Sequence, residues 1–470
     1  MAQAKIICTM GPSCSDASTV ESLISIGMNV ARINFSHGSH DQYRTMISTI
    51  RKAAENKQEP IAILGDLCGP KIRIGKLEKP SITLEEGKEI VITTKEVVGN
   101  AGMVSTTYPN LVSDIEKGGC ILIDDGKIEL EILDVKPENV RCVVRYGGVL
   151  KPHKGMNLPG ADISAPAISA KDMGDIEFAV NEGIDYLALS FVRTPMDVVK
   201  AKKIITNYGS DIPVIAKIEK EEAVSAFDEI LSEADGIMIA RGDLGVEMAS
   251  ELVPLIQKHI IKTCNETAKP VITATQMLES MTYHPQATRA ETSDVANAII
   301  DGSDAVMLSG ETAVGKYPLK AAETMRRIIE GVEGELGGGK SIMEHTPRES
   351  TIEDAVTAAA CRAAELLNAK AVVAYTQSGS TAMRLSQRRP KTRILAISPN
   401  ESIRRRLSLF WGVRTCLVED VLDTDHMADT AGKITKAKGF AETGDIIVIT
   451  SGTPIGVTGT TNLLNVHRIK

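Results

Sequence analysis

The sequence predicts an α/β protein in which an eight-stranded barrel is interrupted by a small all-β domain and followed by an open α/β domain. Short apolar runs rich in β-branched residues alternate with helical patterns on both sides of residues 71–155. Residues 71–155 carry many β-branched residues and turn pairs but almost no helical periodicity. The length of 470 residues alone indicates about three domains.

The chain opens with three βα units. A helix is expected at residues 16–26, after the first strand, and the three expected strands are residues 5–9, 29–34 and 61–66. Residues 68–70 (Cys-Gly-Pro) lead into the all-β region and residues 157–160 (Asn-Leu-Pro-Gly) lead out of it. Such edges suit an inserted domain that moves on two hinge strands.

The βα alternation returns at Ala170 and supplies five more strands, which makes eight. Eight βα units predict a TIM barrel that is interrupted after its third strand. The five later strands are expected at residues 186–190, 214–218, 236–240, 271–275 and 305–309.

A glycine-rich segment at residues 331–340 marks the end of the barrel, and a separate open α/β domain follows it. Its strands are expected at residues 371–376, 393–398, 413–418 and 445–450. The predicted domains are residues 1–69 with 164–338 for the barrel, 70–163 for the inserted mobile domain, and 345–470 for the C-terminal regulatory domain.

Composition argues against several classes of protein. The formal net charge of -8 argues against a nucleic-acid binder, and no apolar stretch of about 18 residues predicts a membrane span. No signal peptide is expected from the N-terminal residues. The eight cysteines are scattered without a Cys-x-x-Cys pair, so we expect reduced thiols rather than a zinc site. These features together indicate a cytoplasmic protein.

Polar side chains gather where the predicted barrel strands end, which is where TIM barrels place their active sites. One such residue alone is more often solvated or capping than catalytic, but six or more of eight strands end this way. The residues concerned are Thr9, Arg32, Asn34, Ser36, His37, Asp66, Lys217, Glu219, Arg241, Gly242, Asp243, Thr275, Ser309 and Glu311.

This set of side chains points to phosphoryl transfer. Glu219 and Asp243 end neighbouring strands, so their carboxylates are suited to hold Mg²⁺ together with phosphates and water. Arg32, Arg73 and Lys217 can neutralise phosphate charge, which supplies most of the catalysis in such reactions. The sequence contains neither a P-loop nor a kinase glycine-rich loop.

Ordered sequence strings identify the chain as similar to the pyruvate kinase family over nearly its whole length. The strings are TMGPS (9–13), MNVARINFSHG (28–38), KGMNLPG (154–160), KIE (217–219), ARGDLGVE (240–247), ITATQMLESM (272–281), TRAE (288–291) and DAVMLSGETAVG (304–315). The resemblance implies transfer of the phosphoryl group of phosphoenolpyruvate to ADP, giving pyruvate and ATP in the last step of glycolysis, with Mg²⁺ or Mn²⁺. It also implies a homotetramer.

The resemblance also implies roles for individual residues. Arg32 would contact the phosphate of phosphoenolpyruvate, and Lys217 would stabilise the phosphoryl group during transfer. Glu219 and Asp243 would hold the metal. The substrate carboxylate would bind to Gly242, Asp243 and Thr275, and Thr275 is also a candidate proton relay to the enolate, with Ser309 a weaker one. The residues that would face the nucleotide are Asn34, His37, Arg73 and Lys154.

The chain departs from the common family pattern after the third strand. Many members carry a threonine and a glutamate of a K⁺ site where this chain has Leu67 and Lys71. The Lys71 ammonium would repel K⁺, so we expect Lys71 to replace the ion and the enzyme to work without it. A residual K⁺ site would use Asn34, Ser36 and Asp66, and the alternative is that Lys71 simply points to solvent.

A hydroxyl-rich turn follows the first strand of the C-terminal domain. Its backbone N–H groups and the dipole of the next helix form a ready phosphate site, and the alternative is ordinary capping by Ser380 or Thr381. In the family, this loop binds a phosphorylated allosteric effector. The loop residues concerned are Thr376, Ser378, Gly379, Ser380 and Thr381, and the turn at 451–461 would complete the pocket.

Two other functions are weighed against this one. A metal-dependent aldolase of the pyruvate class would share the Glu219 and Asp243 pair, but it would need no inserted domain carrying Lys154. A non-catalytic effector sensor would be free to lose Lys217, Glu219 and Asp243, yet all three are present. Dependence on ADP distinguishes the aldolase from the phosphotransferase.

Overall fold

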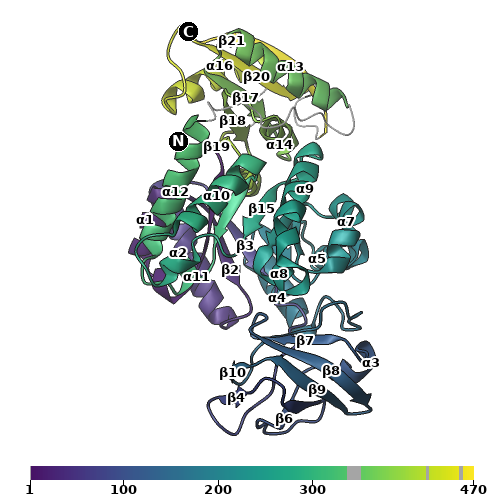
Figure 1. Cartoon of the computed structure of the whole chain (residues 1–470). Coiled ribbons are helices and arrows are strands. Elements are labelled where there is room, and N and C mark those ends of the chain that lie inside the picture. Colours follow the sequence, from purple (N-terminus) through teal and green to yellow (C-terminus); the bar gives the residue numbers. More distant parts are fainter. Residues whose placement is uncertain (1, 336–350, 420–422, 455–458) are drawn as a thin grey trace.

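The fold was analysed in a computed structural model that describes residues 2–335, 351–419, 423–454 and 459–470. Figure 1 shows three parts in a row, with the barrel in the middle, the inserted β domain at one end and the C-terminal domain at the other. The predicted boundaries at 338 and 345 lie outside the described residues, as do parts of the predicted segments 331–340 and 451–461.

Eight parallel strands close the barrel in the order β1-β16-β15-β14-β13-β12-β3-β2. Each strand is short and almost wholly buried, as expected for a parallel sheet covered on both faces. The strands are β1 (Lys5–Thr9), β2 (Met28–Asn34), β3 (Ala62–Asp66), β12 (Tyr186–Leu189), β13 (Val214–Ile218), β14 (Gly236–Ala240), β15 (Val271–Ala274) and β16 (Ala305–Leu308). The predicted barrel and its interruption after the third strand are therefore confirmed.

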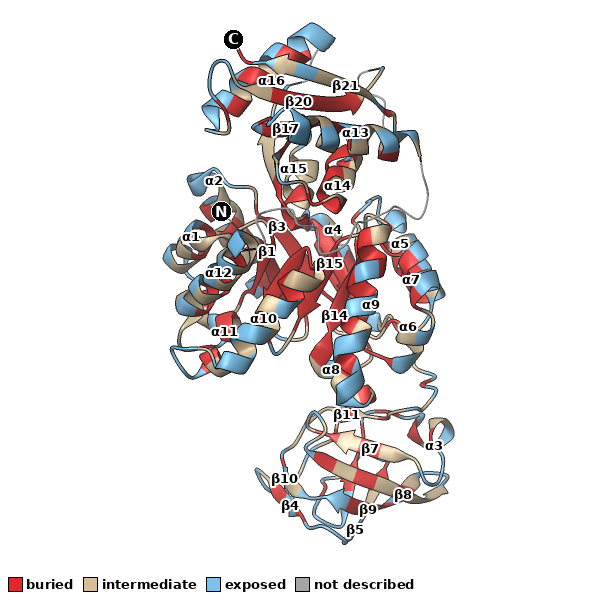
Figure 2. Cartoon of the chain, turned by 45° about the horizontal axis from the view of Figure 1, so that its top comes forward, coloured by how far each residue is buried: buried red, intermediate tan, exposed pale blue. Residues whose placement is uncertain are grey.

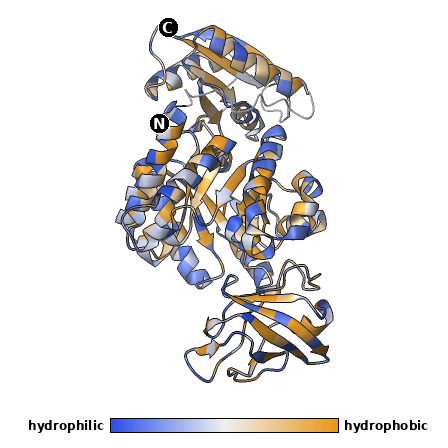
Figure 3. Ribbon diagram, in the orientation of Figure 1, coloured by the Kyte–Doolittle hydropathy of each residue, from blue (hydrophilic) through white to orange (hydrophobic). Residues whose placement is uncertain are grey.

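Two apolar layers hold the barrel together. Ile7, Leu64 and Met238 belong to one buried cluster, whereas their strand neighbours Ile6 and Ile63 pack in another with the surrounding helices. Figures 2 and 3 show the strands as buried and apolar. The helices are α1 (Ala17–Ile26), α2 (His40–Lys57), α4 (Ala170–Asn181), α5 (Pro195–Asn207), α6 (Glu221–Ser225), α7 (Phe227–Glu233), α8 (Arg241–Glu247), α9 (Val253–Glu266), α10 (Arg289–Asp301), α11 (Gly310–Ala313) and α12 (Pro318–Glu335).

The inserted segment forms a six-stranded sheet, β11-β7-β8-β9-β5-β6, and the two-stranded sheet β10-β4. The expectation of an all-β region misses one short helix, α3, whose four residues are too few to show periodicity. The elements are β4 (Ile82–Leu84), β5 (Glu89–Thr93), β6 (Met103–Ser105), α3 (Leu111–Asp114), β7 (Cys120–Ile123), β8 (Ile128–Lys136), β9 (Asn139–Tyr146), β10 (Gly148–Leu150) and β11 (Met156–Asn157).

The C-terminal part is an open sheet of order β19-β18-β17-β20-β21. Its last strand, β21 (Thr461–Arg468), runs antiparallel to β20 and was not expected from the sequence. The other elements are α13 (Ile352–Leu366), β17 (Ala371–Tyr375), α14 (Ser380–Gln387), β18 (Arg393–Ser398), α15 (Glu401–Arg406), β19 (Val413–Leu417), α16 (Thr424–Ala437) and β20 (Ile446–Gly452).

The helices and the cysteines bear on two expectations from the sequence, the absence of a membrane span and the presence of reduced thiols. None of the helices within the described ranges is long and apolar enough to cross a bilayer. All eight cysteines are described and are free thiols, as predicted.

Lys5 joins the start of β1 to the C-terminal domain. Its ammonium donates a hydrogen bond to the carbonyl oxygen of Val413 at 2.7 Å, and only 2% of the residue is exposed. Burial lowers the pKa of Lys5 to about 7, with a further contribution from the nearby charge of Arg414. The folded chain therefore releases this proton near neutral pH, well below the ordinary lysine pKa.

We expect Lys5 to make folding more favourable as pH rises from about 7 towards the unfolded pKa of about 10.4, because the unfolded chain binds the proton across that window. The free energy of unfolding of the wild type, relative to Lys5→Met, should rise by up to about 1.4 kcal/mol per pH unit. Guanidinium unfolding midpoints between pH 7 and 9 measure this difference. Parallel curves for the two proteins would contradict it.

Candidate active site

An ion-pair cluster occupies the C-terminal end of the barrel. Arg32 on β2 donates to Oδ2 of Asp66 through Nε and a terminal nitrogen, each at 2.7 Å. The Lys217 ammonium on β13 lies 3.4 Å from the other Asp66 oxygen. Burial alone would raise the pKa of Asp66, but the charges of Lys217 and Arg32 lower it below the usual value. Asp66 is therefore an anion that orients two cations.

Lys217 lies among carboxylates and a hydroxyl. Its ammonium is 2.6 Å from Oε1 of Glu219 and donates to the Ser190 hydroxyl at 2.8 Å. Burial would lower the pKa of Lys217, but the carboxylates of Asp66, Glu219 and Asp243 raise it above the ordinary lysine value. Lys217 therefore remains a cation throughout the physiological pH range.

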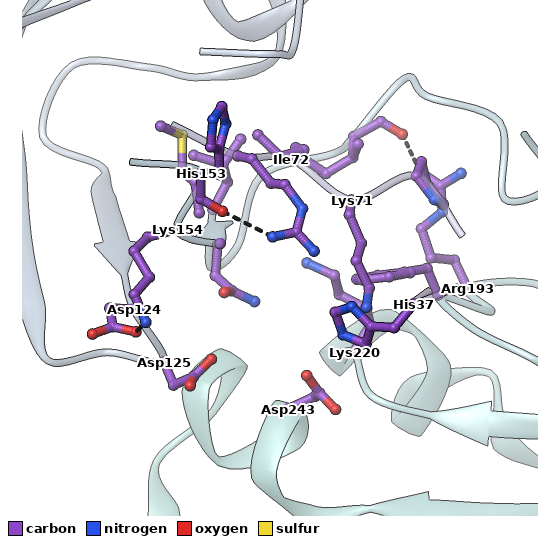
Figure 4. A pocket seen from close by; sticks show the side chains of 18 residues that line it. His37, Lys71, Ile72, Asp124, Asp125, His153, Lys154, Arg193, Lys220 and Asp243 are labelled. Carbon is purple, nitrogen blue, oxygen red and sulfur yellow. Dashed lines mark hydrogen bonds and ion pairs between the residues drawn. The ribbon is translucent and has the colours of Figure 1, made fainter. Parts of the chain in front are cut away.

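Glu219 and Asp243 lie close enough for the charge of one carboxylate to act on the other. Glu219 is buried, and its second oxygen accepts the backbone N–H of Phe191 at 2.9 Å. Asp243 lies in the first turn of α8, and Figure 4 places it at the wall of a cleft. Burial and the charge of Glu219 raise the pKa of Asp243 to about 6. Two mutually repelling carboxylates are a donor set that fits a divalent cation.

This pair would have to share a metal ion with other ligands. Among the described residues, no group of three or more histidine, cysteine, aspartate or glutamate side chains is arranged to hold an ion. Mg²⁺ commonly keeps several waters and binds through one or two carboxylates plus substrate phosphates. The arrangement therefore suits Mg²⁺ better than a metal that needs a complete protein cage.

Thr275 follows β15 in a strained conformation. Its φ of 65° is in the left-handed region, which is unusual for a β-branched residue and typical of functional sites. Its hydroxyl accepts the backbone N–H of Gly242 at 2.8 Å and donates to the carbonyl of Ala274 at 2.6 Å. The ends of β14 and β15 are thereby joined at one point.

Arg241 holds this strained turn in place, a role that the sequence analysis did not assign. The buried guanidinium donates to the carbonyl oxygens of Thr275 at 2.8 Å and Gln276 at 3.2 Å, and it pairs with Asp294 at 2.7 Å. Its place at a strand-to-helix junction was visible in the sequence, but the partners come from distant segments.

Ser309, the weaker candidate for the proton relay, has its hydroxyl buried without a hydrogen-bond partner among the described residues.

A cleft of about 300 Å³ separates the inserted domain from the barrel. Of the residues expected to face the nucleotide, His37, Arg73 and Lys154 line this cleft, and Figure 4 labels His37 and Lys154. Asn34 is not part of this lining, and its side-chain oxygen accepts the N–H of Ser36 at 3.0 Å. Lys154 pairs with Asp124 at 2.7 Å, a partner that the sequence did not reveal.

Positive charge is concentrated on one side of the cleft. Burial lowers the pKa of His37, and three nearby cations lower it further, so its ring is neutral at pH 7. The cations are Lys71, Arg73 and Arg32. The Lys71 ammonium donates to the Ser36 hydroxyl at 2.8 Å, which places it beside the residues of the expected K⁺ site.

The C-terminal loop differs from the capping alternative. Helix α14 begins at Ser380, and its N-cap is Gly379 with φ of 91° and no side-chain cap. Capping by Ser380 or Thr381 is therefore wrong. The Thr376 hydroxyl accepts the N–H of Gly379 at 2.8 Å, whereas the Thr381 hydroxyl is buried against Thr461 at 2.6 Å.

Comparison with known proteins agrees with this architecture. The family model for the pyruvate kinase barrel domain matches residues 1–322, and the model for the pyruvate kinase alpha/beta domain matches residues 354–467. The chain belongs to the pyruvate kinase family. It is therefore a phosphotransferase enzyme, with the barrel and open α/β domain of that family.

Individual relatives support the assignment. Pyruvate kinases from Staphylococcus aureus strains MRSA252 and USA300 are each 45% identical over 472 aligned residues, which cover all of this chain and 81% of theirs. A crystal structure of a pyruvate kinase from Cryptosporidium parvum superimposes with a TM-score of 0.93 at 37% identity. That comparison covers all of this chain and 96% of the solved one.

Proposed function

We propose that this enzyme transfers the phosphoryl group of phosphoenolpyruvate to ADP at the cluster around Lys217. The observation that carries the proposal is a lysine with a raised pKa next to the two carboxylates of Glu219 and Asp243, at the end of a barrel covered by a cation-lined cleft. A bound Mg²⁺ or Mn²⁺ would supply charge neutralisation at the phosphate oxygens. Glu219 and Asp243 would hold it.

The remaining residues would bind the two substrates, some phosphoenolpyruvate and others ADP. Arg32, oriented by Asp66, would bind the phosphate of phosphoenolpyruvate with donors that the ion pair leaves available. The backbone of Gly242 and Asp243, with the Thr275 hydroxyl, would bind the carboxylate. In the cleft between the barrel and the inserted domain, His37, Arg73 and Lys154 would face ADP, as would Asn34, which lies outside the cleft lining.

The raised pKa of Lys217 suggests that phosphoryl transfer and protonation of the enolate depend on different residues. A lysine that stays protonated stabilises negative charge but is a poor proton donor. The proton would instead reach the enolate through Thr275, directly or through a water.

We expect Lys217→Met to lower kcat for pyruvate formation by about a thousandfold or more, since preorganised charge in a dry site is worth several kcal/mol. The same variant should still exchange the methyl hydrogens of pyruvate with deuterated solvent, whereas Thr275→Val should slow that exchange. Pyruvate formation is assayed with and without ADP, and NMR follows the exchange. Activity that does not depend on ADP would favour the aldolase, and loss of exchange in Lys217→Met would contradict the division of roles.

We propose further that the enzyme does not require K⁺, because the Lys71 ammonium supplies the positive charge beside Ser36. The 2.8 Å contact with the Ser36 hydroxyl supports this proposal over a lysine that only points to solvent. Asp66, a member of the residual K⁺ site, is already neutralised by Arg32 and Lys217.

The wild type should therefore turn over in K⁺-free buffer and change less than about twofold when KCl is added. Lys71→Glu should lose about tenfold or more in K⁺-free buffer and recover with KCl, since a carboxylate attracts the ion that the ammonium repels. The exposed Lys76→Glu, in the same segment, is the matched control. A strict K⁺ requirement of the wild type would overturn the proposal.

The loop from Thr376 to Thr381 is proposed as the binding site for the phosphate of an allosteric effector in a homotetramer. The support is a helix of eight residues whose first turn lacks a side-chain cap.

We expect a panel of sugar phosphates and nucleotides to contain a compound that lowers the KM for phosphoenolpyruvate in the wild type but not in Ser380→Asp. The added carboxylate would occupy the helix terminus and repel phosphate. Ser402→Asp, in the first turn of α15, is the matched control. A compound that activates both variants equally would place the effector elsewhere.

A further inference from the structure

The carboxylate of Glu247 connects the inserted domain with the two elements that carry Glu219 and Asp243. Oε1 of Glu247 accepts a hydrogen bond from the Asn157 side-chain amide at 2.8 Å and another from the Lys220 ammonium at 2.7 Å. The side chains of Lys220 and Glu247 are only 8% and 3% exposed. Such a buried group is strongly held because removing one partner leaves the other uncompensated.

The three residues occupy informative positions in the chain. Glu247 ends α8, whose first turn contains Asp243, and Lys220 directly follows Glu219. Asn157 ends β11, the last strand of the inserted sheet. A single oxygen atom of Glu247 therefore joins the inserted domain (the lid) to the helix that carries Asp243 and to the strand end that carries Glu219.

The two hydrogen bonds differ in how easily they can break. Lys220 and Glu247 both belong to the barrel, so their charged pair persists whatever the position of the inserted domain. The Asn157 amide is a neutral donor on the other side of the cleft, and a bond from a neutral donor is weaker than one between two ions. Asn157 is therefore the releasable half of the contact.

The segments on either side of the inserted domain are fixed to the barrel separately. Oδ1 of Asp172 accepts the backbone N–H groups of Cys68 and Gly69 at 3.0 and 3.1 Å. The Arg193 guanidinium donates to the carbonyl oxygens of Ile163 and Ala165. With both connections held, the Asn157 contact sets the angle at which the lid meets the barrel.

That angle determines where the lid cations lie. Lys154 is three residues before Asn157, and its carbonyl accepts the backbone N–H of Ile74. Arg73 is bridged to Gly155 in the same ribbon. Lys220, Asn157 and Asp243 all line the cleft, and Figure 4 labels Lys220 and Asp243.

We propose that Glu247 and Asn157 are positioning residues, and that their hydrogen bond holds the inserted domain at the angle that presents Lys154 and Arg73 to ADP. Lys220 keeps the Glu247 carboxylate in place for this contact. The inference rests on the proposed location of ADP against the inserted domain. It predicts that breaking the contact weakens the use of ADP more than the use of phosphoenolpyruvate.

The test measures KM for ADP and for phosphoenolpyruvate separately, with kcat and the melting temperature. Asn157→Ala should raise the KM for ADP about three- to tenfold, the net effect expected for the loss of one ordinary hydrogen bond, and leave the KM for phosphoenolpyruvate within about twofold. Asn157→Asp should raise the KM for ADP further, because the new carboxylate would then face the carboxylate of Glu247. Asn110→Ala, which removes a bond from the lid to the Ser164 hydroxyl, is the matched control and should leave both constants unchanged.

A reversed pair separates positioning from general stability. In N157D/E247Q the amide and the carboxylate exchange places, so the KM for ADP should return at least halfway from its value in N157D. A merely structural role would not give this rescue. The proposal would be overturned by an unchanged KM for ADP in N157D. An equal rise of the KM for both substrates, or no recovery of the KM for ADP in the double variant, would overturn it as well.

Lys154→Met tests whether ADP lies against the inserted domain, separately from whether Asn157 positions that domain. If Lys154→Met raises the KM for ADP and Asn157→Ala does not, ADP lies against the lid but the contact does not position it. If neither variant changes that constant, both the location of ADP and the positioning role are wrong.

Discussion

The ammonium of Lys217 is the charge on which the arrangement of the active site depends. It lies 2.6 Å from Glu219 and 3.4 Å from Asp66, and the charge of Asp243 also acts on it. Without a cation between them, these carboxylates would repel one another across a buried strand end, at high cost in a low-dielectric interior. Lys217 therefore balances the local charge before any ligand binds.

Strand β1 connects the C-terminal domain with the active-site end of the barrel. At its start, the Lys5 ammonium bonds to the Val413 carbonyl of the C-terminal domain. At its end, the Thr9 hydroxyl accepts a hydrogen bond at 2.9 Å from Arg32. The C-terminal domain and the proposed phosphate-binding cation are thus both in contact with the same five-residue strand, at its two ends.

Sequence patterns were sufficient where the signal is local. The barrel strands are continuous apolar runs, and their C-terminal ends identified Arg32, Lys217, Glu219 and Asp243 as neighbours. Strand β21 was missed because only one of its eight residues is buried, so no apolar alternation marks it. The contacts of Arg241 and of Glu247 could not be predicted, since their partners lie far away in the chain. The missing side-chain cap at Gly379 depends on a backbone angle that the sequence does not state.

The closed barrel also constrains how the chain can be made. Strand β1 pairs with β2 on one side, but its other partner is β16, where Lys5 faces Ala305. During synthesis the backbone groups on that side stay unpaired until the whole inserted segment and five further strands have left the ribosome. An open strand edge invites pairing with other chains. The inserted β domain has its own buried core and can fold early. The segments exposed to pairing with other chains during synthesis are therefore the first three barrel strands.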